Sequence, residues 1–135
     1  MNYSGLTIWL LMLLVAVVWL ALGQVTPGHD TGRWPGAEKI KFRINNIRPD
    51  GLRGAPDGLV SVSYEFCIPA DEQAYQEVLR IDPGIQINAA SPGRIACADN
   101  QALAIGETNQ PHWRDVLQKL SLLPYIAEIR ESFFE

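Results

Sequence analysis

The sequence predicts an α+β protein with one transmembrane helix ahead of a small domain. Residues 1–25 contain no charged side chain, so the 11 Lys and Arg and the 15 Asp and Glu of the 135-residue chain all follow them. Beyond residue 57, stretches of alternating apolar residues, typical of strands, are interleaved with two stretches of helical period. The mean hydropathy of +0.01 therefore averages an apolar segment and a soluble domain.

The N-terminal apolar run predicts a membrane anchor over residues 1–25. It extends over about 20 residues, the length of a helix that crosses the roughly 30 Å hydrocarbon core of a bilayer. Trp9 and Trp19 lie towards its two ends, where aromatic rings favour the interface. A cleaved signal peptide is the alternative, since Ala21-Leu22-Gly23 resembles a cleavage site. However, residues 1–5 lack the Lys or Arg with which such signals begin.

The flanking charges predict the orientation of a retained anchor. No Lys or Arg precedes the span, and four follow it closely: Arg33, Lys39, Lys41 and Arg43. The positive-inside rule then places the C-terminal domain in the cytoplasm and makes membrane lipid one expected partner. A signal peptide would instead place the domain outside the cytoplasm, anchored or secreted.

Residues 26–56 have the composition of a basic linker rich in Pro and Gly, with one edge strand over 39–44. This strand would carry Lys39, Lys41 and Arg43 on one face and three apolar residues on the other. Residues 26–56 have a net charge of +3, whereas residues 57–135 have −7. The basic face is either a solvated edge or a surface for anionic headgroups or an acidic partner, and Trp34 is a second candidate for docking at the membrane or on a partner.

The domain begins with a strand and a helix. The alternation over 59–68 predicts a strand with Val60, Val62, Tyr64, Phe66 and Ile68 facing the core, and with Ser61, Ser63, Glu65 and Cys67 on the open face. A helix starts at Asp71, turns Ala74 or Tyr75, Val78, Leu79 and Ile81 inward, and ends at Asp82-Pro83-Gly84.

The second half of the domain repeats this pattern. Residues 85–88 predict a short strand, and residues 85–106 as a whole form either one long bent hairpin or a three-strand meander. A second helix is capped by Thr108 or Asn109, carries Pro111 in its first turn, and buries Trp113, Val116, Leu117 and Leu120. A last strand covers 125–134. This order predicts a ferredoxin-like domain over 57–135, with two helices on one face of an antiparallel sheet.

The two cysteines lie 30 residues apart, without a C-x-x-C pair or a metal-ligand grouping. In the ferredoxin-like topology the first strand ends beside the start of the third, so Cys67 and Cys97 are expected to be neighbours. They form a disulfide if the compartment is oxidising, and otherwise remain two reduced, partly buried thiols.

The sequence predicts no catalytic residue, cofactor or metal site, and the charge of −7 argues against nucleic acid. Three polar residues of the domain remain as interaction candidates: Glu65 on the open sheet face, Arg94 at a turn and His112 beside Trp113. For each, an ordinary structural role is the simpler interpretation. We therefore expect a non-catalytic, membrane-tethered interaction or assembly subunit, an accessory part of a membrane protein complex. The alternative is a small-ligand sensor or an enzyme component whose site is completed by a partner subunit.

Overall fold

The computed structural model describes residues 34–133. The predicted anchor, its signal-peptide alternative and the start of the linker lie outside these residues, as does the end of the last predicted strand. Within residues 34–133, none of the helices has the length and apolarity needed to span a bilayer. These residues form a mixed α+β structure with two α-helices and two antiparallel sheets, which confirms the predicted α+β class.

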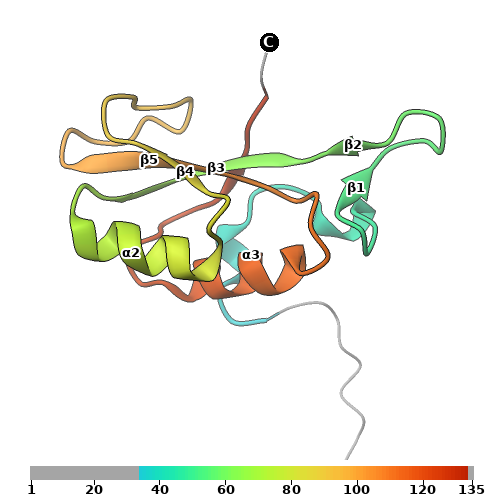
Figure 1. Ribbon diagram of the computed structural model, residues 1–135, viewed down its shortest axis with the longest axis horizontal. Helices are drawn as coiled ribbons and strands as arrows, with labels where there is room; N and C mark the ends of the chain where they lie inside the picture. The colour runs from blue at the N-terminus through green and yellow to red at the C-terminus, as the bar shows by residue number, and fades with distance from the viewer. Residues whose placement is uncertain (1–33, 134–135) are drawn as a thin grey trace, which may run out of the picture. The chain divides into compact units, whose positions relative to one another are not determined.

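The larger sheet has four strands in the order β4-β5-β3-β6, and every neighbouring pair is antiparallel. A separate ribbon pairs β1 with β2 (Figure 1). The elements are β1 (Leu52–Arg53), β2 (Val60–Ser61), β3 (Ser63–Pro69), α2 (Glu72–Ile81), β4 (Gln86–Asn88), β5 (Gln101–Glu107), α3 (Trp113–Leu122) and β6 (Arg130–Glu131). Short 3₁₀ helices cover Ala37–Lys39 and Ile44–Asn46.

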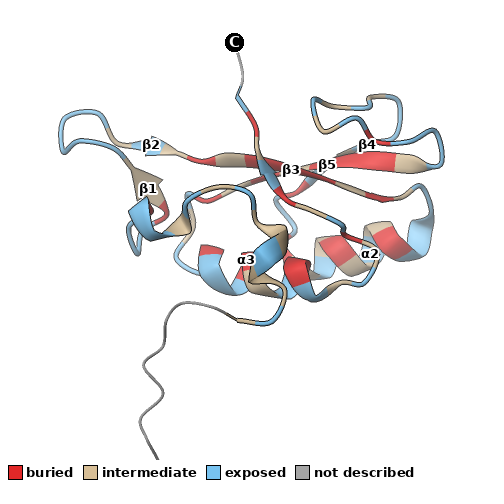
Figure 2. Ribbon diagram, turned by 180° about the vertical axis from the view of Figure 1, so that it is seen from behind, coloured by how far each residue is buried: buried red, intermediate tan, exposed pale blue. Residues whose placement is uncertain are grey.

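Both α-helices lie on the same face of the four-stranded sheet, and the buried residues concentrate between the two layers (Figure 2). The sheet contributes Tyr64, Phe66 and Ile68, and α3 contributes Trp113 and Leu117, all at most 1% exposed. Burying aromatic and aliphatic side chains of this size contributes about 1.5–3 kcal/mol each, so this layer dominates the stability of the domain.

The first strand follows its predicted alternation over most of its length. Val62, Tyr64, Phe66 and Ile68 are buried, as expected. The core placement of Val60 was wrong, because this side chain is 55% exposed. The strand is interrupted at Val62, and its first part pairs with β1 in a ribbon that extends past the helical layer (Figure 1). The alternation of apolar residues therefore continues into the ribbon, where neither α2 nor α3 covers the apolar face.

The two helices match their predicted periods. The Asp71 carboxylate accepts a hydrogen bond from the Ala74 N–H at 2.8 Å and so caps α2. In α3 all four predicted inward positions are buried, but neither Thr108 nor Asn109 caps the helix; its N-cap is His112. Thr108 is instead fully buried, where its hydroxyl accepts from the Val62 N–H at 2.9 Å and donates to the Gly51 carbonyl at 2.6 Å.

The region left open between residues 85 and 106 is a single hairpin. β4 pairs with β5 in antiparallel register, and residues 89–100 form a long loop between them. The left-handed backbone of Gly93 and Ala96, both with φ of 62°, curls this loop and prevents a middle strand. The last strand is also shorter than predicted, because a turn closed by the Ile126 N–H and the Leu123 carbonyl occupies its beginning.

The strand predicted over residues 39–44 is reduced to one parallel bridge between Ile40 and Ile129. A 3₁₀ helix on each side of the bridge turns the chain away from strand geometry. Ile40, Phe42 and Ile44 are nevertheless partly buried against the core, so the period-two pattern marks an edge that packs on the core without a hydrogen-bonded ladder. Ile47 is only 3% exposed. From Trp34 onward, the predicted linker is therefore part of the folded unit.

Candidate interaction groove at the sheet edge

An open groove lies between residues 41–46 and the last strand, with a volume of about 900 Å³. We call it the edge groove. Other hollows on the described surface, beside the disulfide, the start of α3 and the 89–100 loop, have volumes of about 170, 270 and 210 Å³. The edge groove is lined by Lys41, Phe42, Arg43, Asn46, Arg53, Glu128, Arg130, Glu131 and Phe133.

Diverging backbone opens this groove. The Lys41 N–H donates to the Ile129 carbonyl at 2.9 Å, and the Ile129 N–H donates to the Lys39 carbonyl at 2.8 Å. This bridge is isolated, so the pairing does not continue to Glu131. Beyond Lys41, the chain turns into the 3₁₀ helix at Ile44–Asn46, while β6 continues along β3. The edge groove is the space between the two separating segments.

Ion pairs hold two of its cations in place. Arg53 reaches from β1 and donates two hydrogen bonds to the Glu131 carboxylate, one of them at 3.0 Å. This hydrogen bonding raises the pKa of Arg53 and keeps its guanidinium charged. Arg130 pairs with Glu128 at 2.8 Å. Both carboxylates of the groove therefore already have a cationic partner.

Two further cations, Lys41 and Arg43, line the groove and belong to neither of these ion pairs. Lys41 is exposed, and its ammonium group donates to the backbone carbonyl of Glu38 at 2.7 Å. Arg43 is exposed as well. Counting the side chains that line it, the groove has four cations and two anions, while residues 57–135 as a whole are strongly acidic. It is thus a local positive site on an acidic domain.

Aromatic side chains provide the apolar part of the groove. Phe42 stacks on Tyr64 with a centroid separation of 6.4 Å, which fixes its ring against the core. Phe133 is 60% exposed. A ligand with an apolar group beside an anionic group would find both partners within this one groove.

Of the residues predicted for interaction, two serve the fold. The Trp34 indole N–H donates to the Ser121 hydroxyl at 3.1 Å, and its ring packs against the core. The Lys39 ammonium donates to the Leu123 carbonyl at 3.0 Å, at the C-terminus of α3, where a cation is favoured. Both side chains therefore fasten the N-terminal segment to α3.

The other two basic candidates, Lys41 and Arg43, do lie together in the edge groove. Arg53, Arg130 and Phe133, which also line the groove, were not predicted from the sequence. Arg53 stands in a stretch punctuated by Gly and Pro, and only the pairing of β1 with β2 places it beside Glu131. Arg130 and Phe133 follow a turn that shortens the last strand. The one sign of the groove in this part of the sequence is that Arg130 is a basic residue on the predicted last strand.

Glu65 lies on the sheet face opposite the helices, as predicted, but this face is not open at that point. The Glu65 side chain is only 3% exposed. The 89–100 loop covers it so closely that a Cβ at Gly93 would lie 3.1 Å from the Glu65 carboxylate and 2.5 Å from Leu103. This loop also carries Arg94, which is exposed.

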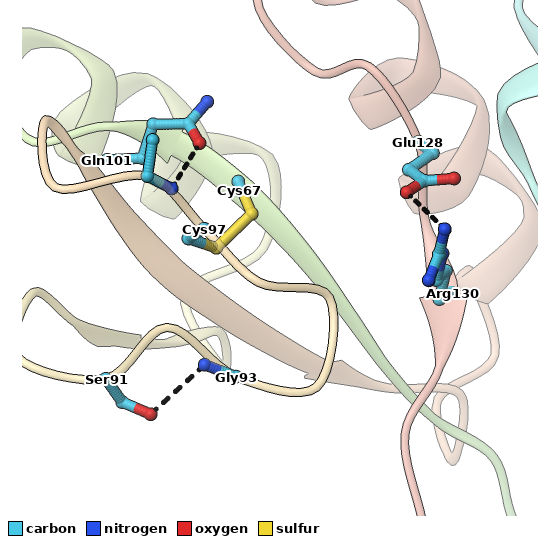
Figure 3. The surroundings of a disulfide bond; sticks show 8 residues. Cys67, Ser91, Gly93, Cys97, Gln101, Glu128 and Arg130 are labelled. Carbon is cyan, nitrogen blue, oxygen red and sulfur yellow. Dashed lines mark hydrogen bonds and ion pairs between the residues drawn. A yellow bond between two sulfur atoms is a disulfide. The ribbon is translucent and has the colours of Figure 1, made fainter.

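A disulfide ties the loop to the sheet. Cys67 on β3 and Cys97 in the loop are bonded, with their Cα atoms 5.5 Å apart (Figure 3). The Ala98 N–H donates to the Gln101 side chain at 2.9 Å and fixes the end of the loop (Figure 3). The disulfide and this hydrogen bond therefore hold the 89–100 loop against the sheet face opposite the helices, part of which it covers.

His112 lies at the start of α3, exposed, in a shallow hollow with Pro49, Arg114 and Asp115. It makes no side-chain capping bond to the helix. Within residues 34–133, no group of three or more His, Cys, Asp and Glu side chains is arranged to hold a metal ion. Comparisons of the chain with protein-family models, with curated proteins and with solved structures gave no match.

Proposed function

We propose that this chain is a non-catalytic, membrane-tethered interaction subunit that assembles with other membrane proteins. The observation that carries the proposal is the edge groove, because it combines exposed cations, an exposed aromatic ring and an unpaired stretch of sheet edge. Such features are typical of surfaces that recognise another chain. The uncharged run over 1–25 supplies the tether.

The scaffold is proposed to be a ferredoxin-like domain. Taking β3, β4, β5 and β6 as the first to fourth strands, the sheet order is second, third, first, fourth, with all neighbours antiparallel. One helix follows the first strand, another follows the third, and both cover one face. These features support the split βαβ arrangement. The ribbon β1–β2 and the segment from Trp34 are additions that build the edge groove.

We infer that the domain lies on the oxidising side of the membrane, the alternative to the cytoplasmic placement predicted from the flanking charges. The Cys67–Cys97 disulfide supports this placement, because such bonds persist mainly outside the cytosol. The flanking charges are weak support for a cytoplasmic domain, because the positive-inside rule counts residues in short connecting loops, whereas Lys39 and its neighbours belong to a folded unit.

Assembly is tested by extracting the full chain from its native membranes with a mild non-ionic detergent and measuring the particle mass by light scattering. We expect retention in the membrane after an alkaline wash, and a particle heavier than one chain in one micelle. A free monomer whose unfolding temperature rises with a member of a metabolite panel would overturn the proposal and favour a small-ligand sensor.

Orientation is tested by trapping thiols in intact cells with a membrane-permeant maleimide that adds visible mass. We expect Cys67 and Cys97 to gain mass only if the trapped sample is first reduced. Protease added outside the cells should then remove the domain. Immediate alkylation of both cysteines, with the domain protected from protease, would place the domain in the cytoplasm.

A further inference from the structure

The backbone of β6 presents unpaired groups to the edge groove. In the antiparallel pair with β3, Ser132 donates its N–H to the Ser63 carbonyl at 2.8 Å, and Tyr64 stands opposite Glu131. Hydrogen-bonded and non-hydrogen-bonded pairs alternate along such a ladder. Glu131 therefore directs its N–H and carbonyl away from β3, on the same side as those of Ile129. Because the bridge at Ile129 is isolated, this part of the edge is open to another strand.

The side chains around this edge select for negative charge. Glu131 and Glu128 are engaged by Arg53 and Arg130, so the charge left to meet a ligand comes from Lys41 and Arg43. Strand addition points alternate side chains of the incoming segment to one side. Acidic residues at alternate positions would meet the two cations, and an apolar residue would meet Phe133.

The charge elsewhere on the domain favours a short segment over a large polyanion. Outside the edge groove, residues 34–133 carry six Lys or Arg against eleven Asp or Glu, a net charge of −5, which repels an extended anionic surface such as a nucleic acid or an acidic bilayer. A short peptide lying in the edge groove contacts only the positive site. A peptide can form main-chain hydrogen bonds with the open backbone edge, whereas a lipid headgroup has no backbone with which to extend the ladder.

We propose that the edge groove binds an extended acidic segment of a partner protein, which adds to β6 as a further strand. This inference rests on the proposed function and specifies its partner. Main-chain hydrogen bonds at Glu131 supply part of the affinity, and Lys41 and Arg43 supply the preference for acidic sequence.

The test uses the full chain in neutral detergent micelles and a fluorescent decapeptide of alternating Glu and Val, read by anisotropy. We expect saturable binding with a dissociation constant below about 1 mM. A Lys–Val decapeptide should not bind. A Glu–Val peptide with methylated backbone nitrogens should bind about tenfold more weakly, because it keeps the charge but cannot complete a ladder.

Variants separate the edge groove from general charge. Lys41→Glu and Arg43→Glu should each weaken Glu–Val binding about fivefold, while Lys119→Glu, a matched change at an exposed position on α3, should leave it unchanged. Urea titration of each variant establishes that it is folded.

The proposal would be overturned if the Glu–Val peptide did not bind, if the methylated peptide bound equally well, or if Lys119→Glu lost as much binding as the groove variants. Preferential binding of the micellar chain to phosphatidylserine vesicles, abolished by Lys41→Glu, would assign the groove to lipid and would also overturn it. The mass measurement that tests assembly does not depend on these peptides, so the two proposals can fail separately.

Discussion

Removing the disulfide should cost the domain a large part of its stability. The bond closes a loop of 30 residues, and the chain-entropy relation for a loop of that length gives about 3.6 kcal/mol at 25 °C. Domains of this size are stable by only about 5–15 kcal/mol. The double variant Cys67→Ser/Cys97→Ser should therefore remain folded with a much smaller margin.

The assay is urea unfolding followed by tryptophan fluorescence, which includes the emission of Trp113, buried in the core. With a slope of about 1–3 kcal/mol per molar urea, the midpoint should fall by roughly 2 M in the double variant. Reduced wild-type chain is the matched control and should unfold at the same midpoint as the double variant. A loss below about 1 kcal/mol with an unchanged slope would show that the bond does not constrain the unfolded chain as argued.

Substitutions at three packed positions, Thr108, Tyr64 and Trp34, are tested by the same titration. Thr108→Val leaves two buried backbone groups without partners and should cost about 2–4 kcal/mol, whereas Thr108→Ser keeps the hydroxyl and should cost about 1 kcal/mol. Tyr64→Phe removes a buried hydroxyl that has no hydrogen-bond partner within residues 34–133 and should be neutral or stabilising. Burial raises the pKa of Tyr64 above its ordinary 10.0, so the unfolded chain ionises first and stability falls above about pH 10; the Phe variant should lose less there. Trp34→Ala should cost about 2–4 kcal/mol, because the ring packs against the core and bonds to α3.

The same titration can contradict the role given to each of these three side chains. Equal losses for the two Thr108 variants would mean that the hydroxyl is unimportant. A Tyr64→Phe variant less stable by more than about 1 kcal/mol would indicate a partner for the hydroxyl, such as an ordered water. A Trp34→Ala variant with wild-type stability would return the N-terminal segment to the role of a linker.

Periodicity predicted the elements whose environment is uniform along their length. β3 and α3 each lie against one continuous apolar layer, so Tyr64, Phe66, Trp113 and Leu120 are buried where the pattern placed them. Burial predicted from the alternation was wrong where the surroundings of a strand change along its length. Val60 continues the alternation of β3 but lies beyond the helices.

Less of the candidate site could be predicted from the sequence, because the groove is formed by segments that are far apart in the chain and come together only in the fold. Lys41 and Arg43 could be singled out from their alternation with apolar residues. Their partners come from other parts of the chain, and the hydrogen bonds between Arg53 and Glu131 join residues 78 positions apart. The burial of Glu65 likewise follows from a loop that a disulfide holds over it. Local patterns do not contain this information.

The basic composition of residues 26–56 therefore has a different meaning from the one that charge counting suggests. Within this stretch, Lys39 binds the end of α3, Arg48 pairs with Asp50 at 3.0 Å, and Arg53 pairs with Glu131. These three cations are engaged by the domain itself. Of the cations that the structure describes in this stretch, Lys41 and Arg43 line the edge groove outside these interactions. The charge is thus concentrated at one unpaired edge of the sheet, which suits recognition of a specific acidic segment better than diffuse attraction to an anionic surface.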